Sequence, residues 1–140
     1  MDKDILHKEI DLIQGVINRM ANNSFLLKGW LISLIAVVLA LSKDSLVSCD
    51  LKLILFILCF PIIIFWYLDA FFLHREKCYR ELYDWVIKNR MISNENIYSL
   101  DFRLHQKNVK SIFRIMFSQT LFSFYGLAFM LLLILMLILK

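Results

Sequence analysis

Three blocks of the chain are almost entirely hydrophobic, and polar segments separate them. The blocks are Phe25–Leu41, Leu51–Leu68 and Phe117–Leu139. A transmembrane helix needs about 20 apolar residues, because each residue rises about 1.5 Å and the hydrocarbon core is about 30 Å thick. The three blocks are close to that length, so the pattern predicts three transmembrane helices. The expected fold class is therefore an all-α integral membrane protein.

The second apolar block leads without a break into a charged helix. No Pro or Gly occurs between Phe65 and Arg90, so one helix is expected to leave the membrane and continue as a cytoplasmic arm. Residues at steps of three and four share one face of this helix. That face consists of Trp66, Asp69, Leu73, Glu76, Arg80 and Tyr83. After a polar turn at 91–96, Ile97–Met116 is expected to form a second helix, which completes a cytoplasmic helical hairpin.

The first 23 residues carry hydrophobic side chains at helical spacing, which is typical of an amphipathic helix. The apolar stripe consists of Leu6, Ile10, Ile13, Ile17 and Met20. The segment Met1–Ser24 contains four acids and three bases, which suits anionic lipid poorly. Packing against a neighbouring subunit or against the arm is therefore favoured over a position flat on the inner leaflet. Asn22, Asn23 and Ser24 are expected to end this helix and to cap the next one.

The distribution of charge predicts the topology. Nine Lys and Arg residues, against five Asp and Glu, occur between His74 and Arg114. By the positive-inside rule this segment is cytoplasmic, so the N-terminus is also cytoplasmic and the C-terminus is external. The chain then has four parts. They are an N-terminal amphipathic helix (1–23), two transmembrane helices with a short external hairpin (24–73), the cytoplasmic arm and basic helix (74–116), and the third transmembrane helix (117–140).

Composition supports a membrane protein and offers no enzymatic machinery. The chain is 60% hydrophobic with a mean hydropathy of +0.67, whereas about half of a soluble domain is apolar. The sequence contains no GxSxG, no Gly-rich phosphate loop, no HExxH and no CxxC pair. His74 and Cys78 are four residues apart, but a metal site would need a second pair of ligands. We therefore expect no catalytic residue, no metal and no cofactor.

Asp69 is the most informative single residue. A carboxylate just inside the cytoplasmic edge of a span is costly, and it usually has a partner or faces water. The candidate partners are Lys28, at the same depth on the first span, and Arg75 and Arg80 beyond it. A structural pair with Lys28 and a charge that lines an ion pathway both fit the pattern. Glu76 and Arg80 are expected to form an ordinary ion pair between residues four apart on a helix.

Four basic residues recur at steps of four, three and four before the third span, which predicts one basic helix face. They are Arg103, Lys107, Lys110 and Arg114. This face suits three roles, which are a positive-inside anchor, a site for anionic lipid headgroups, or a site for a cytoplasmic polyanion such as a nucleotide or oligonucleotide. In the third span, Gln119 and Ser123 suit either a pore lining or hydrogen bonds between helices. A pore would require an oligomer, because three spans cannot enclose one.

Two stretches resemble segments of small prokaryotic membrane proteins. Residues 65–86, FWYLDAFFLHREKCYRELYDWV, match the run W-x-L-D-x-x-x-L-x-x-E-[KR]-x-[FY]-R-x-L-Y. Residues 99–126, SLDFRLHQKNVKSIFRIMFSQTLFSFYG, are similar to the segment that leads into the last span of the same proteins. The chain thus resembles the small multi-span membrane effectors of bacterial anti-phage defence, and among them the membrane ion channel of the Hailong system.

This resemblance implies a homo-oligomeric ion channel, a tetramer, in the bacterial inner membrane. An oligonucleotide or nucleotide made by a partner nucleotidyltransferase would control it, and opening would depolarise the host membrane. On this hypothesis the basic face binds the ligand, and a second group of residues forms the pore or its gate. The second group is Trp66, Asp69, Glu76, Arg80, Gln119 and Ser123. The alternative is a structural membrane adaptor that anchors or regulates a partner protein through its N-terminal helix.

Overall fold

Most of the chain that the structure describes is helical. The computed structural model describes residues 3–43, 51–90, 92 and 97–138. Its elements are α1 (Lys3–Lys43), α2 (Leu51–Asn89), the short 3-10 helices η1 (Phe102–Leu104) and η2 (Gln106–Asn108), α3 (Ile112–Met116) and α4 (Gln119–Ile138). No strand occurs in the described residues, so their all-α character is confirmed.

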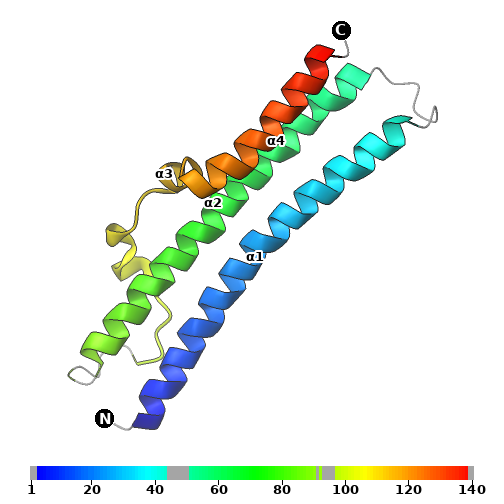
Figure 1. The fold of residues 1–140 in the computed structure, drawn as a ribbon. Coiled ribbons are helices and arrows are strands. Elements are labelled where there is room, and N and C mark those ends of the chain that lie inside the picture. Colours follow the sequence, from blue (N-terminus) through cyan, green and yellow to red (C-terminus); the bar gives the residue numbers. More distant parts are fainter. Residues whose placement is uncertain (1–2, 44–50, 91, 93–96, 139–140) are drawn as a thin grey trace.

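α1 and α2 are two long antiparallel helices that pack side by side (Figure 1). They contain 41 and 39 residues, so each is about 60 Å long, roughly twice the thickness of a hydrocarbon core. Each contains a stretch that is long and apolar enough to cross a membrane. α4 packs against α2 (Figure 1), and its role as a third transmembrane helix stays a prediction.

α2 is continuous from Leu51 to Asn89, and for the part after Phe65 the sequence predicted this continuity. We call residues 51–68 its apolar half and residues 69–89 its polar half. Pro61 lies inside the apolar half and the helix continues through it. The expected arm is therefore the direct extension of a membrane-length helix, and the two halves form one continuous rod.

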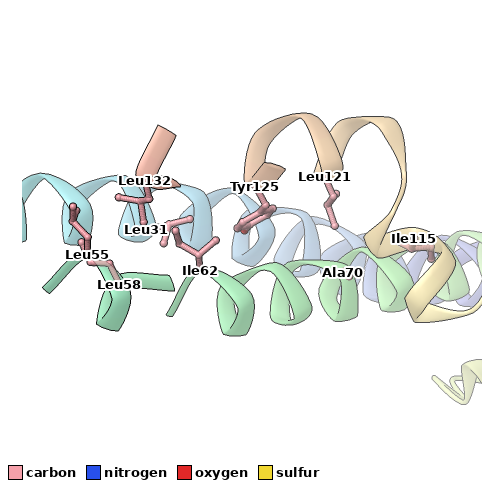
Figure 2. Close-up of a cluster of buried hydrophobic side chains, with 9 residues drawn as sticks. All are labelled: Leu31, Leu55, Leu58, Ile62, Ala70, Ile115, Leu121, Tyr125 and Leu132. Atoms are coloured by element: carbon pink, nitrogen blue, oxygen red, sulfur yellow. The ribbon is translucent and has the colours of Figure 1, made fainter. Parts of the chain in front are cut away.

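Two hydrophobic cores stabilise the bundle, one mainly along the apolar half of α2 and one near the end of its polar half. The larger core joins α1, α2, α3 and α4 (Figure 2). It consists of Leu31, Leu55, Leu58, Ile62, Ala70, Ile115, Leu121, Tyr125 and Leu132. The smaller core joins Ile13 and Ile17 of α1 to Leu82 and Val86 of α2. The apolar stripe of the N-terminal helix thus packs against the arm of its own chain.

The predicted break at residues 22–24 is wrong, because α1 passes through them without interruption. Asn and Ser in a helix interior cost less than about 0.7 kcal/mol each relative to Ala, whereas Pro costs about 3 kcal/mol. The Ser24 hydroxyl bonds to Asp69 of α2 instead of capping the following turn. The amphipathic helix and the first apolar block are therefore one helix.

The predicted second helix over Ile97–Met116 is also wrong. We call residues 97–111 the return segment, since it leads back along α2 through η1 and η2 to α3. Tyr98 has a φ of 61°, in the left-handed region that an α-helix excludes. The Asp101 side chain accepts a hydrogen bond from the Arg103 backbone N–H, a local bond that competes with helix formation. Residues 44–50 of the expected external hairpin, and residues 91 and 93–96 of the expected turn, lie outside the described residues.

Candidate functional site

The buried carboxylate of Asp69 lies where the polar half of α2 begins, and it binds side chains from both other long helices. Asp69 is 0% exposed. Lys28 of α1 places its Nζ atom 2.5 Å from Asp69 Oδ2. Tyr125 of α4 donates a hydrogen bond from its hydroxyl to the same oxygen at 3.0 Å, and Ser24 of α1 donates its hydroxyl to Oδ1. One carboxylate thus connects three helices.

Lys28 is the partner that the sequence predicted first, and this prediction is confirmed. Its Nζ atom also donates to the Ser24 Oγ atom at 3.0 Å, because the two residues lie one helical turn apart on α1. The Lys28 side chain remains 27% exposed, so this ion pair is less enclosed on its α1 side than on the side of Asp69. The two other candidates have different partners, since Arg75 lies over the Phe102 ring at 4.4 Å and Arg80 pairs with Glu76.

Trp66 holds the junction of α3 and α4 against α2. Its indole Nε1–H donates to the backbone oxygen of Met116 at 2.8 Å, one of the carbonyls at the end of α3. The Trp66 ring stacks on the Tyr125 ring with centroids 6.0 Å apart and planes 8° apart, and it meets Phe117 edge-on at 5.6 Å. Trp66 therefore supports Tyr125, which in turn binds Asp69.

We call Asp69 with Ser24, Lys28 and Tyr125 the Asp69 cluster. It acts as an electrostatic clamp, since the attraction to one buried charge holds three helices together. One carboxylate is balanced by one ammonium group and by two hydroxyl donors, so each helix contributes to neutralising the same buried charge. Removing a partner from a buried ion pair typically costs about 3–5 kcal/mol. A displacement of α1 or α4 relative to α2 would carry part of that cost. The bundle therefore has a marked preference for the arrangement in which all three helices meet at Asp69.

Of the other predicted pore and gating residues, two pair with each other and two face outward. Arg80 Nε donates to Glu76 Oε1 at 2.9 Å, as the spacing predicted, and the Arg80 side chain is 62% exposed. Gln119 and Ser123 of α4 are exposed, and the Ser123 hydroxyl donates to the Gln119 backbone oxygen at 2.6 Å. No bond between these four residues and Asp69 occurs in the described part of the chain.

The four bases of the expected ligand site do not share one helix face, because the return segment is not a helix. All four are exposed, but they lie at different heights along α2. Arg103 follows Asp101, which lines a pocket with Trp85 and Arg90. Lys110 lines a pocket with residues 77, 80, 81 and 84 of α2. Arg114 belongs to α3, near Trp66 and the end of the apolar half.

The sequence interpretation missed a second buried ion pair, at the far end of the polar half. Arg90 donates from Nε to Glu9 Oε2 at 2.7 Å, and its Nη2 atom lies 2.5 Å from Glu9 Oε1. The side chains are 1% and 0% exposed. The backbone N–H of Tyr98 also donates to Glu9 Oε1 at 3.2 Å. One signal was available, since Glu9 lies four residues before Ile13 and thus borders the apolar stripe.

His74 and Cys78 do come together in the polar half of α2, as a buried pair. The Cys78 Sγ atom lies 3.7 Å from His74 Nδ1. Burial lowers the pKa of His74, with a further contribution from Arg75, and burial raises the pKa of the Cys78 thiol. Both shifts favour the neutral forms. No group of three or more potential metal ligands forms among the residues that the structure describes.

Comparisons with known proteins add no further assignment, since no family model, no curated protein and no solved structure matches the chain. The resemblance to membrane effectors of anti-phage defence therefore stays a prediction.

Proposed function

We propose that the protein is a homo-oligomeric ion channel of the bacterial inner membrane, gated at the Asp69 cluster, which acts as an effector of anti-phage defence. The observation that supports this proposal is the position of Asp69 on a continuous helix. The cytoplasmic arm and the apolar half of α2 are one rod, and the buried carboxylate that joins all three helices lies where the two halves meet. A force on the arm would act directly on this clamp.

Side chains that face outward in the single chain support an oligomer. Gln119 and Ser123 are exposed on α4, in a position where isolated polar groups facing lipid would be costly. On α1 the small residues Gly29, Ser33 and Ala36 are also exposed, and small residues let membrane helices approach closely. Contacts between copies would bury both faces, with α4 as the third span and Gln119 and Ser123 next to a pore.

Control by a nucleotide or oligonucleotide completes the proposal. Lys107 is exposed, and it forms no ion pair with the described residues. Arg103 pairs only with the half-exposed Asp101, at 3.3 Å. Both lie on the cytoplasmic part of the chain, away from the apolar half of α2. A polyanion bound there would pull on the return segment, which is packed against the arm through Phe102 and Tyr79, with ring centroids 5.3 Å apart.

The test is ion flux from liposomes that contain the purified protein, combined with native mass spectrometry. We expect an oligomer with bound nucleotide, and a flux that changes when the nucleotide is removed. Asp69→Asn should alter the flux, whereas Lys88→Gln, which removes an exposed charge from the same helix, should leave it unchanged. A monomer without flux, or equal flux from both variants, would contradict gating at Asp69.

One observation favours the adaptor as a second candidate. Leu12 of the N-terminal helix is 48% exposed and lines a pocket with Lys8, Asp11 and Tyr98. A partner protein could insert an apolar side chain there. The adaptor predicts a stable protein without conductance whose partner is lost on Leu12→Asp, and the same liposomes with co-purification of partners distinguish the two functions.

A further inference from the structure

The short helix α3 exposes two large aromatic side chains. Phe113 is 69% exposed and Phe117, directly after the helix, is 64% exposed. Ile115 faces the other way and is buried in the larger core (Figure 2). Fully burying a phenylalanine side chain is worth about 1.5–3 kcal/mol. The exposed side of α3 is therefore an apolar surface that the chain itself leaves uncovered.

The position of α3 places this surface at the edge of the proposed membrane region. The Met116 carbonyl of α3 accepts the hydrogen bond from Trp66, and Trp66 lies two residues before the end of the apolar half of α2. α4 begins at Gln119, three residues after α3 ends. A five-residue helix is about 7.5 Å long, comparable to the headgroup layer on one side of a bilayer, which is about 5–8 Å thick.

Arg114 adds a positive charge to the same short helix. It is exposed, and it makes no ion pair with any of the residues that the structure describes. A guanidinium group binds phosphate with two parallel hydrogen bonds. Aromatic side chains beside a cation are typical of segments that lie at the membrane–water interface.

We propose that α3 is an interfacial anchor that binds an anionic phospholipid of the cytoplasmic leaflet. Phe113 and Phe117 enter the boundary of the acyl chains, and the Arg114 guanidinium binds the lipid phosphate. This inference rests on the membrane placement in the proposed function. A lipid fits better than an oligonucleotide, because an oligonucleotide offers phosphates but no apolar phase for two exposed phenylalanine rings.

The first test measures the surroundings of α3 in reconstituted bilayers of phosphatidylcholine and phosphatidylglycerol. Single-cysteine variants Phe113→Cys and Phe117→Cys, made in a Cys49→Ser, Cys59→Ser and Cys78→Ala background, carry a spin label. We expect both labels to collide more often with oxygen, which concentrates in lipid, than with a water-soluble nickel chelate. A label at Asp84→Cys, on the exposed side of the arm, should collide more often with the nickel chelate than with oxygen.

Two results of this experiment would overturn the anchor. Labels at 113 and 117 that behave like the label at 84 would place α3 in water, and labels shielded from both reagents would place it against another protein chain. Ile57→Cys, on an exposed position of the apolar half of α2, is the reference for the membrane itself. If that label were also in water, the membrane placement would fail, and with it the proposed function.

The second test concerns the lipid headgroup. Spin-labelled phosphatidylglycerol and phosphatidylcholine report which lipid associates with the protein. We expect Arg114→Gln to lower the preference for phosphatidylglycerol at this site about fivefold, because one base near the surface contributes about 1 kcal/mol. The matched variant Lys107→Gln should leave the preference unchanged. An equal effect of both variants would overturn the site, and so would an Arg114→Gln variant that loses only binding of a short oligonucleotide.

Discussion

Two buried ion pairs connect α1 to α2, and they differ in what surrounds them. Lys28–Asp69 includes a lysine side chain that is 27% exposed, and it is shared with Tyr125 of α4. Glu9–Arg90 is buried on both sides, and its described neighbours include the backbone N–H of Tyr98 and the Trp85 ring, over which the guanidinium lies at 5.3 Å. The first pair has alternatives within reach, since Lys28 also bonds to Ser24. The Glu9–Arg90 pair holds the start of α1 against the end of α2. The Lys28–Asp69 pair is where the bundle can rearrange.

The largest effect is expected at the Glu9–Arg90 pair. Arg90→Met leaves the Glu9 carboxylate buried with only a backbone donor, and we expect a loss of about 3–5 kcal/mol in the free energy of unfolding. Denaturant unfolding in detergent micelles measures this loss. Lys88→Gln removes an exposed charge on the same helix and should change the free energy of unfolding by less than about 0.5 kcal/mol. A loss below about 1 kcal/mol for Arg90→Met would show that the two pairs do not differ as described.

A smaller effect is expected at the shared pair. Asp69→Asn removes the charge and keeps one of the two acceptor oxygens that Ser24 and Tyr125 use. The hydroxyl that faces the new NH2 group can accept a hydrogen bond from it, and Lys28 can turn toward the surroundings. We therefore expect a loss of about 2 kcal/mol, below that of Arg90→Met. A double-mutant cycle with Lys28→Met should give a coupling energy of about 1–2 kcal/mol. Additive effects in the cycle would mean that Lys28 and Asp69 act independently.

The smallest of the three effects is expected from Tyr125→Phe. The ring stays in place against Trp66, and only the hydroxyl donor to Asp69 is lost. A hydrogen bond to a charged group contributes about 1.5–3 kcal/mol, and we expect a value near the lower end because Lys28 still compensates the carboxylate. Hydrogen exchange should rise in α4 and remain unchanged around Glu9 and Arg90. A uniform rise in both regions would contradict the independence of the two pairs.

The shared pair, Lys28 and Asp69, could be predicted from the sequence because each partner restricts the choice of the other. Lys28 and Asp69 are single charges in otherwise apolar stretches at the same expected depth, so few other partners are available to either. The hydrogen bonds from Ser24 and Tyr125 to Asp69 were not predicted, because a hydroxyl group in an apolar segment does not require a charged partner. Ser24 also carried a stronger local signal, as a helix cap, which the continuous α1 overrides.

The Glu9–Arg90 pair could not be predicted in the same way. Glu9 and Arg90 are 81 residues apart, and each belongs to a region rich in charges with many local alternatives. Only the packing of Ile13 against Val86 in one core decides that these two meet. The prediction of a helix over the return segment was wrong for a different reason. Regular spacing of its bases suggested a helix, while local bonds such as the one from Arg103 to Asp101 and the positive φ of Tyr98 determine its backbone.

The order in which the partners of Asp69 are synthesised has a consequence for membrane insertion. Tyr125 follows Asp69 by 56 residues, which corresponds to about 3–11 s of translation at about 5–20 residues per second. Lys28 and Ser24 precede it, so both are already present when the carboxylate reaches the bilayer. In the proposed membrane placement, α1 and α2 alone would supply Asp69 with a counter-charge and a hydroxyl donor, and α4 would add its own donor later.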